Sequence, residues 1–208
     1  MKPGKNTKSQ LLTTAIQLFA ESGFHGTTVD KIVSAAGVNK RMVYHYFGDK
    51  EGLYQSVIKE VYDHLSALEI QAFEKSKTFR DNLTEIIHLY FDFLDQNPHF
   101  TRILQWENLN EGKNIRSTDL KLFKSPFLGA LERELNKAKK TNQIRADLDA
   151  KHLLISLIGL CQIYSSNRYT LSQTLGIDLY SVKTRSLKKE HTIKLLLHGI
   201  LKKEQTPQ

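Results

Sequence analysis

The segment KRMVYHYFGDK, residues 40–50, concentrates side chains that can donate hydrogen bonds to nucleic acid. At 100° per residue of a helix, Val43 and Phe47 fall on one side, and Arg41 and His45 fall on the opposite side. An arginine can donate two hydrogen bonds to N7 and O6 of guanine, and a tyrosine hydroxyl can reach a phosphate. The segment therefore predicts a short helix whose polar side fits the major groove of DNA. Short motifs of this kind also occur in proteins that never bind DNA, so a plain solvated helix surface is the alternative.

The residues before this segment carry the signals of a second helix and a tight turn. Apolar residues recur there at helical spacing, and Thr27 in front of them is a suitable N-cap. Gly37 can end that helix in the left-handed conformation at no steric cost, and Asn39 can cap the next helix. We therefore predict a helix–turn–helix over about residues 27–47.

Two longer segments resemble the N-terminal DNA-binding domain of the TetR/AcrR family of bacterial transcriptional regulators. They are LFAESGFHGTTVDKIVSAAGV and NKRMVYHYFGDKEGLY. The rest of the chain fits that family in being helical and of the expected length. The resemblance implies that some of these side chains contact the DNA backbone and that others face the bases. The implied backbone contacts are Thr28, Tyr44, Tyr46 and Lys50, and the implied base contacts are Lys40, Arg41, Met42 and His45.

Two residues depart from the family pattern. Asp30 stands where some members carry a basic residue that reads a base, so we expect that contact to be absent. Met42 stands where a small polar residue is common, and its side chain can instead contact the methyl group of thymine. Both departures concern the operator sequence and leave the predicted DNA-binding role unchanged.

Composition and charge agree with a helical protein that binds an anionic partner. The chain has 208 residues, of which 40% are hydrophobic, and four prolines and eleven glycines are too few for a turn-rich β fold. Its formal net charge is +8. Residues 1–50 hold seven Lys and Arg against three Asp and Glu, so the charge per residue is about three times denser there than in the rest. Lys2, Lys5 and Lys8 belong either to a basic arm that reaches flanking phosphates or, as we prefer, to a frayed terminus.

No combination of residues indicates an enzyme, a cofactor or a metal site. The one cysteine, Cys161, lies in an apolar run and excludes an internal disulfide. The eight histidines show no HExxH or i, i+4 pair, and no glycine-rich phosphate loop is present. The most apolar stretch is too short to span a membrane, and no signal peptide is visible, so we expect a cytoplasmic protein.

Helical periodicity continues through the remaining chain. We predict helices over residues 7–22, 49–68, 80–95, 98–106, 119–124, 126–140, 147–167 and 186–203, with Gly23 ending the first and loops over 108–118 and 170–184. Ser125 and Pro126 form an N-cap and N1 pair. The expected fold is all-α: a three-helix DNA-binding domain over residues 7–67, followed by a larger helical domain over residues 68–204 for effector binding and dimerisation.

In the family that the sequence resembles, the last two long helices pair with those of a second subunit. Both helices here are more apolar than the surface of a monomer requires, although ordinary core packing explains the same pattern. A dimer would place two recognition helices about 34 Å apart on successive major grooves of a palindromic operator.

Aromatic side chains on the later helices, interleaved with a few polar ones, suggest a small-molecule pocket. Arg102 precedes Trp106 by one turn and can hold an anionic ligand against the indole ring, although a surface ion pair beside a packed tryptophan explains the same pattern. The predicted ligand-binding residues are Tyr90, Phe93, Arg102, Trp106, Phe127 and Tyr164.

The favoured function is a dimeric, ligand-responsive transcriptional regulator, with a repressor preferred, that a small molecule releases from its operator. The alternative is a helical protein-interaction module without sequence-specific DNA binding. An enzyme is the third possibility, and no group of residues supports it.

Overall fold

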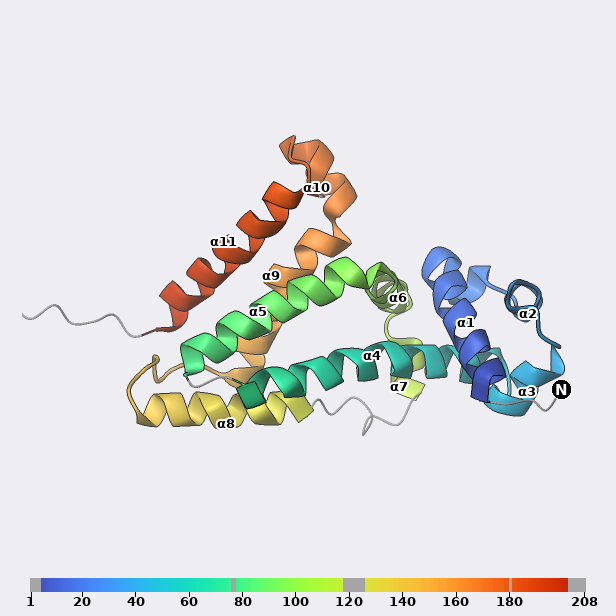
Figure 1. Cartoon of the computed structure of the whole chain (residues 1–208), viewed down its shortest axis with the longest axis horizontal. Helices are drawn as coiled ribbons and strands as arrows, with labels where there is room; N and C mark the ends of the chain where they lie inside the picture. The colour runs from blue at the N-terminus through green and yellow to red at the C-terminus, as the bar shows by residue number, and fades with distance from the viewer. Residues whose placement is uncertain (1–4, 76–77, 118–125, 180, 202–208) are drawn as a thin grey trace, which may run out of the picture. The chain divides into compact units, whose positions relative to one another are not determined.

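The computed structural model describes residues 5–75, 78–117, 126–179 and 181–201. In these residues every regular element is helical, as predicted, and the only β pairing is an isolated bridge between Ile144 and Leu201. The helices are α1 (Lys5–Gly26), α2 (Val29–Ala36), α3 (Arg41–Phe47), α4 (Lys50–Lys75), α5 (Phe79–Gln96), α6 (Pro98–Leu109), α7 (Lys113–Ser117), α8 (Pro126–Lys140), α9 (Ala150–Ser166), α10 (Arg168–Leu175) and α11 (Val182–Ile200) (Figure 1).

The helices form two compact units. The first unit contains residues 1–64 and 97–124, and the second contains residues 65–96 and 125–208. This division differs from the predicted domains, 7–67 and 68–204, because α6 and α7 belong to the first unit. Helix α4 contributes to both units.

The core of the first unit is built from the apolar sides of α1 to α4. Leu11 and Phe19 of α1 are fully buried, as are Ile32 of α2, Val43 of α3 and Leu53 of α4. A hydrogen bond from the Gln10 side chain to the carbonyl oxygen of Ala36, 2.8 Å long, ties α1 to the end of α2. The short helices α2 and α3 are therefore held by α1, against which both of them pack.

Helix α6 joins the first unit through a tight contact with α1. Gly23 has φ 66° and ψ −179°, which breaks α1 as predicted, but the chain resumes helical geometry as far as Gly26. The ring of Trp106 lies directly on Gly23, where an added Cβ would be 2.7 Å from Cδ2 of the indole. The indole nitrogen donates a 3.3 Å hydrogen bond to the carbonyl oxygen of Ala20. Glycine is therefore required at position 23 for both its backbone conformation and its lack of a side chain.

Helix α7 is fixed to α6 by a buried carboxylate. Glu107 accepts hydrogen bonds from the backbone N–H groups of Asn114 and Ile115, at 2.8 and 3.0 Å. These N–H groups belong to the first turn of α7, which has no intrahelical acceptors for them. The sequence predicts a loop over residues 108–118, and this prediction is wrong because Glu107 stabilises a turn of helix there.

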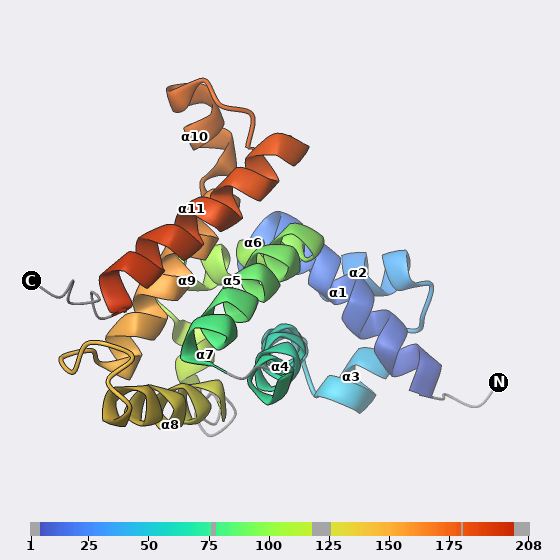
Figure 2. The same cartoon turned by 60° about the vertical axis from the view of Figure 1, so that its left-hand side comes forward.

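In the second unit, α5 packs against α9 and α11, and α8 packs against α9 and α5. Figures 1 and 2 both show α10 where α9 and α11 meet, at the end away from α8. Lys188 of α11 is buried, and its ammonium donates to both carboxylate oxygens of Asp95 on α5, at 2.8 and 3.0 Å. The cation also lies 4.9 Å from the centre of the Phe91 ring. This buried charge is therefore paired, as burial requires.

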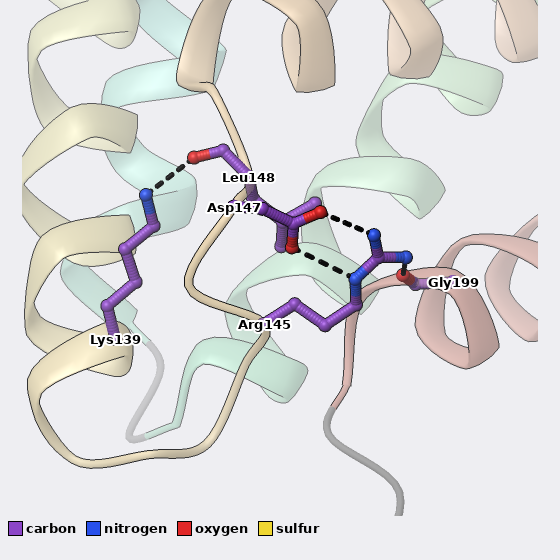
Figure 3. Close-up of polar contacts among 5 residues, drawn as sticks. All are labelled: Lys139, Arg145, Asp147, Leu148 and Gly199. Carbon is purple, nitrogen blue, oxygen red and sulfur yellow. Dashed lines mark hydrogen bonds and ion pairs between the residues drawn. The ribbon is translucent and has the colours of Figure 1, made fainter.

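The connection between α8 and α9 is held against the end of α11 (Figure 3). Arg145 pairs with Asp147 and donates from Nη1 to the carbonyl oxygen of Gly199, 3.2 Å away. Its backbone N–H donates to the carbonyl oxygen of Ile200, and Lys139 donates to that of Leu148. Arg145 therefore satisfies two carbonyl groups at the C-terminus of α11 that have no helical partner.

Several helix boundaries differ from the prediction: α4 and α6 extend beyond it, to Lys75 and Leu109, and three more differences lie in the second unit. Asp149, and not Asp147, caps α9 by accepting the N–H groups of Lys151 and His152. The predicted loop over residues 170–184 contains α10 and the start of α11, which is capped by Ser181. The last helix ends at Ile200. The predicted helix over residues 119–124 and the Ser125 cap lie outside the described residues.

We predict that Gly23→Ala destabilises the protein far more than Gly37→Ala. Both glycines have positive φ, but an added Cβ meets the Trp106 ring at position 23 and meets nothing within 4 Å at position 37. The expected loss in unfolding free energy is about 3 kcal/mol or more for Gly23→Ala and about 1 kcal/mol for Gly37→Ala. Chemical denaturation of the two full-length variants measures this difference, and equal losses would contradict the role given to Trp106.

Candidate nucleic-acid interface

Helix α2 begins at an exposed threonine. The side-chain oxygen of Thr28 accepts the N–H of Lys31, so Thr28 is the N-cap. The prediction that Thr27 is the cap is wrong: Thr27 is buried and donates its hydroxyl hydrogen to the carbonyl oxygen of Leu18 in α1. The Thr28 hydroxyl keeps its own hydrogen for donation, and a phosphate oxygen is a suitable acceptor.

The turn between α2 and α3 has the predicted chemistry. Gly37 adopts the left-handed conformation, with φ 63°, and its N–H donates to the carbonyl oxygens at the end of α2. The N–H of Val38 donates to the carbonyl oxygen of Val33, 3.1 Å away. The side chain of Asn39 accepts the N–H of Arg41 at 2.9 Å, which starts α3. The turn is therefore fixed by local hydrogen bonds.

Helix α3 separates its side chains as the spacing predicts. Val43 and Phe47 are buried, whereas Arg41, Tyr44 and His45 are exposed. The remaining predicted contacts of this helix, Met42 and Tyr46, are half-buried, and the rings of His45 and Tyr46 meet edge to face. The helix thus presents a cation, a phenol and an imidazole on one side.

Three lysines lie around α3. Lys40, directly before the helix, forms a 2.8 Å ion pair with Asp30 of α2. Lys50 begins α4, one residue after the predicted start, and its ammonium lies 4.4 Å from the centre of the Phe24 ring. Partial burial lowers the pKa of Lys50. Lys8 belongs to α1 and not to a frayed terminus, and its ammonium lies 5.8 Å from the centre of the Phe47 ring. Lys8 comes close to α3 only through the packing of α1 on α3, which the sequence does not show.

The predicted ligand-binding residues fall in both units. Arg102 and Trp106 lie on α6 in the first unit, where both are half-buried. In the second unit, Tyr90, Phe93 and Phe127 are buried and Tyr164 is half-buried. The rings of Tyr90 and Phe127 are 6.4 Å apart, and Tyr164 packs edge to face on Phe91.

A buried carboxyl group lies beside these aromatic residues of the second unit. Glu69 of α4 is almost fully buried and accepts a hydrogen bond from the hydroxyl of Tyr90. Burial raises the pKa of Glu69 from about 4.5 to about 7, and the Tyr90 hydrogen bond acts in the opposite direction. The sequence reasoning missed this residue, because one glutamate in a helix gives no sign of burial.

Among the described residues, none of the helices combines the length and the hydropathy that a membrane span requires. The same residues contain no group of three or more His, Cys, Asp or Glu side chains that could hold a metal ion.

An exposed polar helix that follows a tight turn and packs on α1 has the geometry of a helix–turn–helix motif of DNA-binding proteins. Residues 11–57 match the family model of "Bacterial regulatory proteins, tetR family", and residues 80–196 match that of "Tetracyclin repressor-like, C-terminal domain". The chain belongs to the TetR family of bacterial transcriptional regulators.

Individual relatives agree with this assignment. The chain is 31% identical over 174 residues to the HTH-type transcriptional repressor NicS of Pseudomonas putida, covering 83% of this chain and 82% of NicS. It is 24% identical over 193 residues to the HTH-type transcriptional regulator RutR of Escherichia coli, covering 93% and 90% of the two chains. The fold is similar to that of the fatty acid degradation regulator FadR from Bacillus halodurans, with a TM-score of 0.75, 23% identity and coverage of 96% and 98%. FadR from Bacillus subtilis, solved with stearoyl-CoA, gives a TM-score of 0.72 at 23% identity and coverage of 92% and 98%.

We predict that Glu69→Gln changes how stability depends on pH. A carboxyl group whose pKa is raised by folding favours the folded state at low pH, and this contribution is lost as pH rises from about 4.5 to about 7. The wild type should lose this contribution between pH 5 and pH 8, and the glutamine variant should not. The unfolding free energy of the variant minus that of the wild type should therefore rise by about 2–3 kcal/mol over this range. Urea denaturation across this range measures the gain, and exposed Glu132, changed to Gln, is the control. A parallel pH dependence of the wild type and Glu69→Gln would count against a neutral buried carboxyl group.

Proposed function

We propose that this regulator binds a palindromic operator as a dimer, represses transcription, and leaves the operator when a small molecule binds its second unit. The observation that carries the proposal is the division of α3, which buries Val43 and Phe47 and exposes Arg41 and His45. A repressor is preferred because NicS, the relative at 31% identity, is named as one. Such a protein acts where the bacterial chromosome lies, in the cytoplasm.

The positions of the exposed side chains support two kinds of DNA contact. Arg41 and His45 point away from the core and suit base edges in the major groove, and Lys40 and Met42 flank them. The remaining predicted contacts suit phosphates, which orient the protein and carry no sequence information. The phosphate contacts are Thr28, Tyr44, Tyr46 and Lys50.

The dimer interface that we propose is formed by α9 and α11. Ile155 and Ile163 of α9 are 64% and 42% exposed, and Leu187 and Leu195 of α11 are 52% and 51% exposed. Apolar side chains gathered on two neighbouring helices mark an interaction surface more than isolated ones do. Gly159, which is also exposed on α9, allows a second helix to approach closely. A second copy of the chain would bury these residues in a four-helix bundle.

The effector site that we propose lies among the aromatic residues of the second unit. Tyr90, Phe93, Phe127 and Tyr164 supply apolar surface, and Glu69 supplies a polar group that can orient a ligand. FadR of Bacillus subtilis was solved with stearoyl-CoA, so a protein of similar fold accommodates a small molecule. Arg102 and Trp106 stay predictions for the same role. The ligand releases DNA only if it prefers the conformation that does not fit the operator.

The competing interpretation, a protein-interaction module, gives a different result in one experiment. Purified protein is offered a library of random duplexes at two salt concentrations, and the retained duplexes are sequenced. A regulator enriches a two-fold symmetric sequence that persists at the higher salt. A module that docks on an acidic protein enriches no sequence, and its weak DNA binding disappears with salt.

We predict that Arg41→Ala and Lys50→Ala weaken DNA binding in different ways. Loss of a base contact should cost about 1–3 kcal/mol at the selected operator and relax its sequence preference. Loss of a phosphate contact should weaken binding to every duplex and make the salt slope shallower by about one unit. Fluorescence anisotropy over a salt series separates the two effects, and Lys59→Ala, which removes a half-buried lysine paired with Asp63 on α4, controls for charge. Equal operator binding by the wild type and Arg41→Ala would refute the base-reading role.

We predict that the double variant Ile155→Arg with Leu195→Arg is a monomer. Four arginines brought together in the bundle repel each other and cannot be desolvated without partners. Operator affinity should fall by about a hundredfold or more, because each half-site is then bound independently. Analytical ultracentrifugation gives the mass, and Leu109→Arg, at an exposed leucine of α6, is the matched control. A double variant that sediments as a dimer would exclude this interface.

A further inference from the structure

The helix–turn–helix carries an ion pair between its two helices. Asp30 lies in the first turn of α2, and Lys40 directly precedes α3; the ammonium and Oδ1 are 2.8 Å apart. The Asp30 side chain is 72% exposed and that of Lys40 is 48% exposed. The pair thus lies on the surface, two residues after Thr28 and next to Arg41.

Stability does not explain this pair. An ion pair between exposed side chains contributes little to folding, because water and salt screen the charges and both side chains lose freedom. The hydrogen bond from Lys40 to Asp30, together with the attraction between the charges, raises the pKa of Lys40. Lys40 is therefore positioned in the free protein at little cost.

Near DNA, the same pair has a larger effect. A carboxylate close to a polyanion opposes binding to every sequence unless a cation neutralises it. An ammonium group has three donor hydrogens, so the bond to Asp30 occupies one and leaves others for a base. Guanine offers two acceptors, N7 and O6, in the major groove. A lysine held by a carboxylate can therefore reach a base edge while being restrained from swinging to a phosphate.

We propose that Asp30 is a positioning residue for sequence specificity: it holds Lys40 toward the bases and weakens binding to DNA that lacks the matching guanine. The inference rests on the proposed operator-binding function. It assigns a role in that function to an acidic residue, whose negative charge by itself opposes binding to DNA. Specificity of this kind comes from opposing the wrong partner as well as from attracting the right one.

The test is a double-mutant cycle with Asp30→Asn, Lys40→Ala and the variant that carries both changes. Binding of the selected operator and of a scrambled duplex is measured by fluorescence anisotropy over a salt series. The control is Glu21→Gln, which removes one negative charge, as Asp30→Asn does, from an exposed position near the C-terminal end of α1. Thermal denaturation of all variants verifies that they fold.

With Asp30→Asn, the released lysine should bind phosphate, so scrambled DNA binds more tightly and the salt slope steepens by about 0.9. The ratio of operator to scrambled affinity should fall by roughly tenfold, the scale of one base contact. In the Lys40→Ala background, Asp30→Asn should leave that ratio unchanged, because Asp30 acts through Lys40.

Two results overturn the inference and leave the proposed function intact. If Asp30→Asn lowers the ratio equally with and without Lys40, the carboxylate reads a base directly, for which the amino group of cytosine is suitable. If Asp30→Asn gives the same ratio as Glu21→Gln, the pair has no role in specificity. A wild-type protein that distinguishes no duplex from any other overturns both the inference and the proposed function.

Discussion

The burial of two side chains, Val43 and Phe47, is the interaction on which the DNA-binding surface depends. A helix of seven residues does not persist alone in water, because few backbone hydrogen bonds offset the cost of ordering the first turn. Helix α3 exists because these side chains enter the core of the first unit, and its start is set by Asn39. The exposure of Arg41 and His45 follows from that burial, since the opposite side of the same helix has to face solvent.

The helix–turn–helix was predictable because its signals are local. Gly37 ends one helix and Asn39 starts the next through hydrogen bonds within a few residues, so the local sequence contains the information. The same approach failed between Thr27 and Thr28, because either residue can cap a helix. A tertiary contact decides the matter: Thr27 donates to the carbonyl oxygen of Leu18, which leaves Thr28 as the cap.

The predictions failed where distant residues determine the structure. Nothing near Trp106 in the sequence indicates that its ring packs on Gly23, yet this contact joins α6 to the first unit. Helix α10 is largely polar and none of its residues is buried, so no apolar side facing a core marks it as a helix. The buried state of Glu69 depends on the packing around Tyr90. The sequence therefore predicted the fold class and the helix–turn–helix, but not the packing of α6 on α1 or the buried contact of Glu69 with Tyr90.

Two exposed ion pairs show how a structural role and a functional role can be told apart. Arg145 pairs with Asp147 and also donates to the carbonyl oxygen of Gly199, so it joins segments that are distant in the chain. Its removal would leave a helix end unsatisfied, which is a sufficient reason for its presence. The pair of Asp30 and Lys40 joins two helices that Gly37 and Asn39 already fix. Because the fold does not need that pair and screening makes it weak, a role at the bound DNA explains it better than stability does.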